Sequence, residues 1–379
     1  MLTNKANWLV QHGYDVSIVT TDQQGRQPYF KLNDKIQTYD LGINYDADNG
    51  HLLSKLLHYP IRQWKHRQQL SRLLCQLKAD IVICMFNNDV SFVHKLKDGS
   101  HKILEAHFSK NKKLQYDRHG LWALADRWRT RQEERIVRKY ERFVVLTKED
   151  KELWTIDNSQ CTIDNGEADR LVVIPNARTS SLNAKRSTLN HKRVLAIGRY
   201  DYQKGFDTLI NIWKEVNYNA NANGNANGRG WRLDIIGDGP LREALQQQVE
   251  RLGLQDSVRL LMPTDHIQEA YLNASIFVMT SRYEGLPMVL LEAQVCGLPI
   301  VSFACPCGPR DIIADGVNGY LIENRDETLF AQRLSTLMQD SALRQCMGAA
   351  AAINSEAYTE DCIMQQWEAL FKEFIRVNG

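Results

Sequence analysis

The sequence lacks any apolar run near the roughly 20 residues that a membrane-spanning helix needs. No apolar stretch at its N-terminus is typical of a signal peptide either. With 43% hydrophobic and 24% charged residues among 379, the composition is typical of an ordinary globular protein, and the length favours two domains. We therefore expect a cytoplasmic protein.

Paired cysteines are also scarce. Cys75, Cys84 and Cys296 lie inside apolar runs, and the one close pair is Cys305 and Cys307. A structural zinc cage needs a second pair, so we interpret the eight cysteines as buried or incidental thiols and predict no metal. The Asp-x-Asp pattern at Asp46 and Asp48 lacks a flanking apolar strand, which favours a solvated loop over a metal site.

The two halves of the chain differ in charge. Residues 1–186 hold 30 Lys and Arg against 22 Asp and Glu, and residues 187–379 hold 17 against 23. Basic and aromatic residues alternate in two segments, at Arg62, Trp64, Lys65, Arg67 and Arg72, and at Lys110, Lys112, Lys113, Tyr116, Arg118, Trp122, Arg127, Trp128, Arg129 and Arg131. Two interpretations stay open: an anionic membrane surface, or solvated helices whose tryptophans point into the core. A pI of 8.0 does not favour nucleic acid.

Strand-length apolar runs alternate with helical patterns throughout, which predicts an α/β fold of two doubly wound parallel sheets. The runs are YDVSIVTT, ADIVICMF, KILEAHF, RFVVLT and RLVVIPN, and then KRVLAIG, WRLDIIG, SVRLLM, SIFVMT, LPIVSF and NGYLI. A polar linker is expected near residues 177–191, and the Asn/Ala/Gly tract at 217–230 is expected to be a mobile loop.

These patterns predict three parts: residues 1–186 as a first domain, 187–356 as a second, and 357–379 as a C-terminal helix that crosses back to the first domain. The chain opens on a helix, LTNKANWLVQHG, whereas a doubly wound domain usually starts with a strand. We therefore expect that the first strand and its glycine-rich turn are missing from this sequence.

Residues 281–293, SRYEGLPMVLLEA, place two carboxylates on either side of a helix start. Pro287 suits the first helical position, where free backbone N–H groups attract a phosphate. Glu292 then lies inside the helix, where it can meet a ribose diol, and Glu284 in the preceding loop can meet sugar hydroxyls. This layout predicts a nucleotide-sugar site.

Cations follow the first strand of the second half. The strand VLAIG runs through Gly198 into a turn with Arg199 and Lys204, at a carboxyl strand end where open α/β sheets bind ligands. Two cations there suit a diphosphate.

Several sequence motifs follow one another in the order found in a known enzyme family. They are HGYDVSIVTTD, EAHFS, FVVLTKEDKELW and VVIPN in the first half, and GRYDYQKGFDTLI, IIGDGPLREAL, SRYEGLPMVLLEAQVCGLPIVSF and GPRDIIADGVNGYLI in the second. Over nearly its whole length the chain resembles glycosyltransferase family 4 enzymes of bacterial polysaccharide biosynthesis, which have the GT-B fold with two domains facing a cleft. The resemblance implies an acceptor-side first domain, a donor-binding second domain, and transfer of a hexose from a nucleotide sugar with retention at the anomeric carbon.

The resemblance also implies residue roles. It assigns the diphosphate to Arg199 and Lys204, the ribose to Glu292, and the donor sugar to Glu284 with the backbone at Gly285 and Leu286. His107 matches the first-domain histidine near the transferred sugar. The expected catalytic residues are His107, Glu284, Arg199 and Lys204, and the remaining donor-binding residues are Gly198, Gly237, Pro263, Gly285, Leu286, Pro287 and Glu292. Thr264 accompanies Pro263 where the family reads the base.

The favoured function is therefore transfer from a UDP-hexose to a lipid-linked or saccharide acceptor, without a cofactor, on the inner face of the cytoplasmic membrane. Two alternatives remain. The missing strand and turn favour a non-catalytic or truncated nucleotide-sugar-binding partner, and the same fold also serves sugar-nucleotide epimerases.

Overall fold

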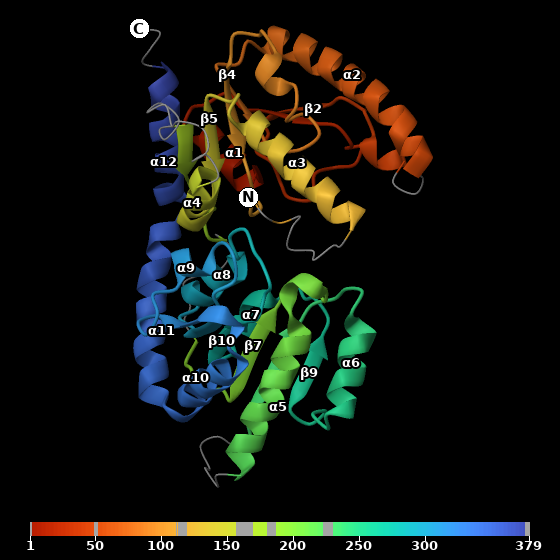
Figure 1. Ribbon diagram of the computed structural model, residues 1–379. Coiled ribbons are helices and arrows are strands. Elements are labelled where there is room, and N and C mark those ends of the chain that lie inside the picture. The colour runs from red at the N-terminus through yellow and green to blue at the C-terminus, as the bar shows by residue number, and fades with distance from the viewer. Residues whose placement is uncertain are drawn as a thin grey trace.

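The computed structural model describes residues 2–48, 52–110, 112, 120–156, 170–179, 187–222 and 230–375 (Figure 1). The helices of its first half are α1 (Leu2–Gln11), α2 (Leu52–Leu77), α3 (Leu121–Val137) and α4 (Lys148–Ile156). The strands of this half are β1 (Ser17–Thr20), β2 (Gln37–Asp40), β3 (Ile81–Cys84), β4 (His101–Glu105), β5 (Arg142–Val145) and β6 (Leu171–Val173).

The second half repeats the alternation of strands and helices. Its strands are β7 (Arg193–Ile197), β8 (Arg232–Ile236), β9 (Val258–Leu261), β10 (Ile276–Met279), β11 (Ile300–Phe303) and β12 (Gly319–Ile322). Its helices are α5 (Phe206–Ala222), α6 (Arg242–Arg251), α7 (Ile267–Leu272), α8 (Met288–Val295), α9 (Pro309–Ile312), α10 (Glu327–Gln339) and α11 (Ser341–Ser355), and α12 (Glu360–Ile375) ends the described chain.

All strand pairs are parallel, which confirms the predicted fold class. In the second half the order is β12-β11-β10-β7-β8-β9, with crossover helices on the faces. In the first half β3-β4-β5-β6 form one sheet, and β1-β2 form a separate two-stranded sheet. Each strand predicted from an apolar run is present. Strand β2 was not predicted, because its sequence QTYD is polar and mostly exposed.

In the second half, buried apolar side chains pack in two clusters around the sheet. Strands β10 and β11 are fully buried, as expected for parallel strands between two helical layers. The strands β1 and β3 of the first half are mostly half-buried. Strands β10 and β11 are therefore more deeply buried than β1 and β3.

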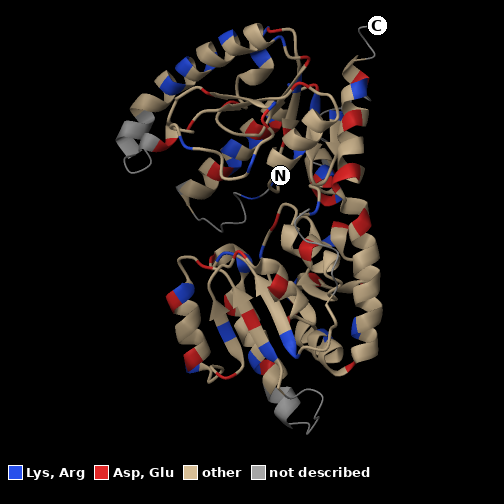
Figure 2. Cartoon of the chain, turned by 180° about the vertical axis from the view of Figure 1, so that it is seen from behind, with Lys and Arg blue, Asp and Glu red and all other residues tan. Residues whose placement is uncertain are grey.

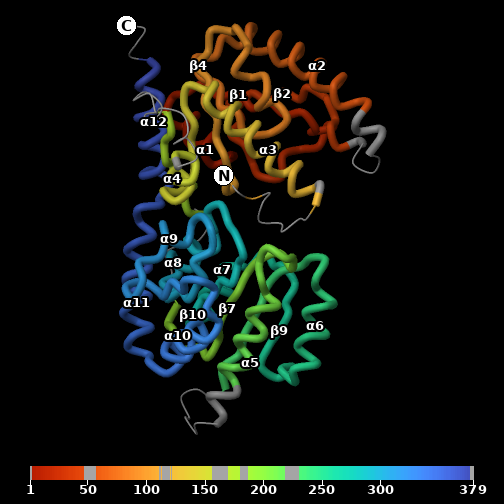
Figure 3. Tube along the Cα trace, viewed as in Figure 1, coloured from red at the N-terminus to blue at the C-terminus, as the bar shows by residue number. Residues whose placement is uncertain are grey.

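Helix α12 returns to the first half after α11 has run along the second half (Figure 3). Its apolar side, which includes Met364, Trp367 and Phe371, packs with Trp8 of α1 and Ile103 of β4 in one buried cluster. A hydrogen bond of 2.8 Å from Trp8 Nε1 to Asp361 Oδ1 fixes the two helices to each other.

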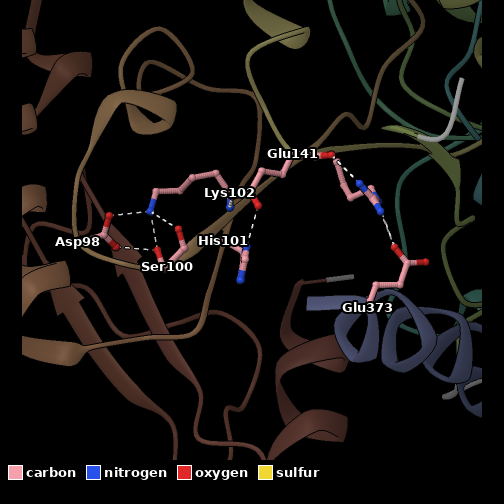
Figure 4. A network of polar contacts seen from close by, with 7 residues as sticks. Asp98, Ser100, His101, Lys102, Glu141 and Glu373 are labelled. Atoms are coloured by element: carbon pink, nitrogen blue, oxygen red, sulfur yellow. Dashed lines mark hydrogen bonds and ion pairs between the residues drawn. The ribbon is translucent and has the colours of Figure 1, made fainter. Parts of the chain in front are cut away.

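A polar network at the amino end of β4 holds the far end of α12 (Figure 4). Arg142 Nη2 lies 2.8 Å from Glu373 Oε2, and the His101 ring stacks on Phe374 with ring centres 4.6 Å apart. On the other side of the strand, Lys102 Nζ forms a buried ion pair of 2.6 Å with Asp98.

Two expectations about loops need correction. Helix α5 continues to Ala222, so residues 217–222 of the Asn/Ala/Gly tract are helical, and 223–229 lie outside the described residues. Alanine has the highest helix propensity, which offsets the asparagines at the helix end. Tyr45–Asp48 forms a 3-10 helix and not an open loop. The middle of the expected linker, 180–186, also lies outside the described residues.

Replacing Trp367 with alanine is expected to destabilise the first half by about 3–5 kcal/mol, since it leaves a large cavity between α1, α12 and β4. Urea unfolding followed by far-UV circular dichroism measures this loss. The control is Gln365→Ala on the exposed side of α12, with an expected effect within about 0.5 kcal/mol. Equal midpoints for the two variants would show that α12 contributes little to the first half.

Candidate functional site

The turn after β7 fixes the position of Lys204. Asp201 caps the 3-10 helix Tyr202–Lys204 by accepting a hydrogen bond from the Lys204 backbone N–H. Gly205 follows with φ +63°, and a Cβ there would lie 2.4 Å from the carbonyl oxygen of Thr280. Only glycine therefore lets this turn lie against the end of β10. The Lys204 side chain runs along Gly198, where a Cβ would lie 3.0–3.1 Å from its methylenes.

Lys204 points at Glu284. Its Nζ lies 2.7 Å from Glu284 Oε1, and both side chains are largely buried. Gln203, which the sequence patterns did not single out, donates a hydrogen bond of 3.0 Å to the carbonyl of Tyr283 and lies 3.4 Å from Glu284 Oε2. Adjacent residues of one turn thus hold the carboxylate from two sides. Two of the predicted catalytic residues are in direct contact.

Arg199 behaves differently from Lys204. Its side chain is 69% exposed, and its Nε lies 2.6 Å from Asp201 Oδ2. Of the two predicted cations, only Lys204 is held in a fixed, mostly buried position, and Arg199 stands at the surface of the same turn.

The loop from Glu284 to Pro287 leads into α8. The Glu284 N–H donates a 3.0 Å hydrogen bond to the carbonyl of Pro306. Pro287 is the N-cap with φ −74° and ψ 96°, and the helix begins at Met288, so the prediction of Pro287 at the first helical position was wrong by one residue. Its extended ψ angle is not helical, although its φ would suit a helix. The first turn of α8 still starts directly beside Glu284.

Glu292 lies in α8, eight positions after Glu284 in the sequence. Its Oε2 accepts a 2.8 Å hydrogen bond from Tyr271 Oη, and its Oε1 accepts a 2.9 Å bond from Thr179 Oγ1. Thr179 belongs to the segment that joins the two halves. The carboxylate is thus held between α7 and this segment.

Gly285 brings the two halves together. A Cβ at Gly285 would lie 2.8 Å from the carbonyl oxygen of His107 and 3.3 Å from Cα of Phe108. The loop after β4 therefore touches the loop that carries Glu284. This contact places His107 beside the predicted sugar-binding residues, although they are separated by more than 170 positions in the sequence.

His107 has charged neighbours of its own. Its Nε2 lies 3.2 Å from Glu105 Oε1, and Glu105 accepts 2.7 Å hydrogen bonds on both oxygens from Lys5 of α1. Burial by itself would raise the pKa of Glu105, but the attraction of Lys5 and His107 outweighs it and lowers the pKa to about 2. Neither Lys5 nor Glu105 was predicted, since an isolated lysine in a first helix gives no signal.

Gly237 follows β8 and also touches the β7 turn. A Cβ at Gly237 would lie 1.9 Å from the carbonyl oxygen of Gly198, so only glycine fits. Pro263 and Thr264 lie in the exposed loop after β9. Thr264 lines a pocket of about 330 Å³ along the β7–β9 face beside α7, together with Ile236 and Leu261. Neither Lys204 nor Glu284 lines this pocket.

Further contacts join the halves on the other side of the site. Cys307 donates its backbone N–H to Glu149 at 3.0 Å, Arg310 pairs with the same carboxylate at 3.0 Å, and Lys148 donates its backbone N–H to Asp311 at 2.8 Å. Asp150 is buried beneath them, and this burial raises its pKa to about 6.

The basic and aromatic segments of the first half are largely at the surface. Trp64 of α2 and Trp122 and Trp128 of α3 are 65%, 60% and 62% exposed, so these tryptophans do not point into the core. Lys and Arg residues recur along the described part of α2 (Figure 2). Lys110 does not belong to this surface, because its side chain is buried and its Nζ lies 3.0 Å from Glu134 Oε1. Lys113, Tyr116 and Arg118 lie outside the described residues.

The described part of the chain offers neither a membrane-spanning helix nor a metal-binding cluster. No helix there is long and apolar enough to span a bilayer. Within the same residues, no cluster of three or more histidine, cysteine or acidic side chains has an arrangement that could hold a metal ion.

Comparison with known proteins shows which proteins this chain resembles. Residues 178–353 match the family model of glycosyl transferases group 1. The amylovoran biosynthesis glycosyltransferase AmsD of Erwinia amylovora is 36% identical over 233 residues, which make up 60% of this chain and 61% of that protein. An uncharacterized glycosyltransferase of Haemophilus influenzae is 26% identical over 376 residues, covering 97% of this chain and 94% of its own.

A solved structure extends the likeness to the whole fold. Anabaena HepE, crystallised in complex with UDP and glucose, superimposes with a TM-score of 0.67 at 16% identity, over 94% of this chain and 100% of that one. Two α/β halves whose parallel sheets meet at their carboxyl-end loops have the GT-B fold, and the chain is similar to glycosyltransferases over nearly its whole length. More particularly, its second half carries a group 1 glycosyltransferase domain, and its relatives include glycosyltransferases of polysaccharide biosynthesis.

The raised pKa of Asp150 makes a prediction about stability. Between about pH 4 and 6 the folded chain keeps a proton that the unfolded chain, with a carboxyl pKa near 3.8, has lost. Stability therefore falls as pH rises through this window, by about 3 kcal/mol, and levels off above it. Asp150→Asn is expected to remove that loss, so its stability relative to the parent rises from pH 4 to 6. Urea unfolding at each pH measures this, with exposed Asp256→Asn as the control. Parallel pH profiles of parent and Asp150→Asn would contradict the assignment.

Proposed function

We propose that this chain is a retaining family 4 glycosyltransferase that moves a hexose from UDP-hexose to a lipid-linked or saccharide acceptor in the assembly of a surface polysaccharide. The observation that carries the proposal is the buried Lys204–Glu284 pair, 2.7 Å apart, which lies beside the start of α8 and close to the His107 loop of the other half. Support for UDP comes from HepE, whose structure contains UDP and glucose.

In the proposed reaction, the bond between the anomeric carbon and the diphosphate oxygen breaks, a bond to the acceptor hydroxyl oxygen forms, and the acceptor proton passes to the departed diphosphate. Negative charge grows on the leaving diphosphate while the sugar ring becomes oxocarbenium-like. Lys204 and the first turn of α8 oppose that charge, and Arg199 adds a second cation from the surface. A diphosphate leaves without being protonated, so this step needs no general acid, and Lys204, Arg199 and the first turn of α8 would supply the opposing positive charge.

The proposed roles require Lys204 and Glu292 to change partners. Lys204 now neutralises Glu284, and the diphosphate would share this cation. Glu292 now accepts from Tyr271 and Thr179, and a ribose diol would replace one of these donors. Glu284, with the backbone of Gly285 and Leu286, would then contact the sugar hydroxyls.

We further propose that residues 1–186 form the acceptor-side domain, 187–356 the donor domain, and 357–379 the crossing helix. On α2, the exposed Leu57, Ile61 and Trp64 follow helical spacing and form one apolar stripe, with Lys65 and Arg67 beside it. On α3, Leu124 and Trp128 lie one turn apart. Apolar side chains with basic neighbours fit the anionic inner face of the cytoplasmic membrane, where a lipid-linked acceptor would be held.

Substitutions in the donor site test the nucleotide assignment. Lys204→Ala and Glu292→Ala are each expected to weaken UDP binding about tenfold, because each removes one contact worth about 1.4 kcal/mol. Glu284→Gln is expected to keep UDP affinity, since it frees Lys204, and to lower turnover of UDP-hexose about 100-fold or more. Titration calorimetry with UDP and a UDP-release assay measure the two effects.

Lys214→Ala, on the exposed side of α5, is the matched control for loss of a positive charge and should behave as the parent. Equal UDP affinity in the parent, Lys204→Ala and Glu292→Ala would remove the site assignment. Binding of GDP with no binding of UDP would keep the site and change the donor.

Liposome sedimentation tests the membrane proposal. The parent is expected to bind phosphatidylglycerol vesicles at low salt and to dissociate at high salt, as a basic surface requires. Trp64→Ala combined with Trp128→Ala should reduce binding at low salt several-fold, since it removes the largest exposed apolar groups. Lys214→Ala should have no effect. Unchanged binding of the tryptophan variant, or binding to neutral vesicles alone, would count against this surface.

A further inference from the structure

His107 is a polar side chain without a complete set of partners. Its side chain is 24% exposed, yet both ring nitrogens are buried, and neither makes a well-directed hydrogen bond to a described residue. The nearby charge is on Glu105, whose Oε1 lies 3.2 Å from Nε2. A carboxylate at this distance attracts a ring proton to Nε2, which leaves Nδ1 as an acceptor.

Glu105 is itself held in place from another element. Both of its oxygens accept from Lys5 at 2.7 Å, and the side chains of Glu105 and Lys5 are 2% and 14% exposed. Lys5 Nζ also lies 3.6 Å above the centre of the Trp367 ring of α12. Burial lowers the pKa of Lys5 and Glu105 opposes this, while Lys5 keeps the carboxyl of Glu105 ionised. The carboxylate is therefore a charged group with a fixed orientation.

We propose that Glu105, held by Lys5, is a positioning residue that fixes the Nε2–H tautomer and the ring orientation of His107 beside the donor hexose. This inference rests on the proposed function, since it assigns a partner to His107 in that reaction. Glu105 acts through His107 and does not touch the substrate. Through Trp367, the same chain of contacts makes the orientation of His107 depend on the C-terminal helix.

The other end of β4 supplies a matched control. Lys102 and Asp98 form a second buried ion pair there, 2.6 Å apart, with side chains 6% and 1% exposed (Figure 4). It resembles the Lys5–Glu105 pair in chemistry and burial, but it lies at the amino end of the strand, away from His107. Neutralising either pair should affect folding similarly, whereas only one pair should affect His107.

The test compares two neutral double variants, so that no unpaired charge is left buried. One is Lys5→Met with Glu105→Gln, and the other is Lys102→Met with Asp98→Asn. The first is expected to keep UDP affinity within about twofold and to lower turnover of UDP-hexose about 10- to 100-fold, as a misplaced contact does. The second should keep both values. This split between binding and turnover would not follow from a merely structural role.

The ring tautomer gives a second, activity-independent readout. In ¹⁵N-histidine spectra, with the His107 signal assigned by its absence in His107→Gln, the parent and the Lys102 variant should show a proton on Nε2. The Lys5/Glu105 variant should lose that preference. The same tautomer and the same turnover in all three proteins would overturn the proposal. A parent protein without UDP-hexose turnover would contradict the proposed reaction. The spectra would still show whether Glu105 fixes the ring tautomer of His107.

Discussion

The site depends on one constraint: parallel strands deliver their carboxyl-end loops to a single edge, and here the edges of two sheets meet. The loop after β4 touches the loop after β10 so closely that only glycine fits at Gly285. On the second-half side, Gly205 and Gly237 permit equally close contacts with Thr280 and Gly198. Glycines at these contacts allow Lys204, Glu284 and His107, which come from three different loops, to lie in one region.

Ion pairs then determine how these side chains are oriented. Buried pairs seldom add much net stability, but they fix geometry because an unpaired charge would be costly there. Lys204–Glu284 and Lys5–Glu105 are both 2.7 Å apart, and the first pair consists of two predicted catalytic residues, whereas the second lies beside His107. Under the proposed function, the donor diphosphate would share the positive charge of Lys204 that Glu284 now neutralises.

Much of this was predictable from the sequence. Apolar periodicity predicted the strands, because fully buried parallel strands such as IFVM leave a clear signal. The proposed donor-site residues lie in local sequence motifs at strand ends and at a helix start, so the elements that carry them could be predicted. Lys5, Gln203 and Thr179 could not be found in this way, because their partners lie 80 or more positions away and depend on how elements pack. The exposure of Trp64 and Trp128 was likewise undecided, since their helices carry both apolar and charged residues on several sides.

The most direct test of the central claim is a crystal structure of the chain with UDP. The account predicts that the diphosphate contacts Lys204 and the first turn of α8, and that the ribose hydroxyls replace Thr179 or Tyr271 at Glu292. UDP bound elsewhere, for example in the pocket beside α7 with Lys204 still paired to Glu284, would contradict it.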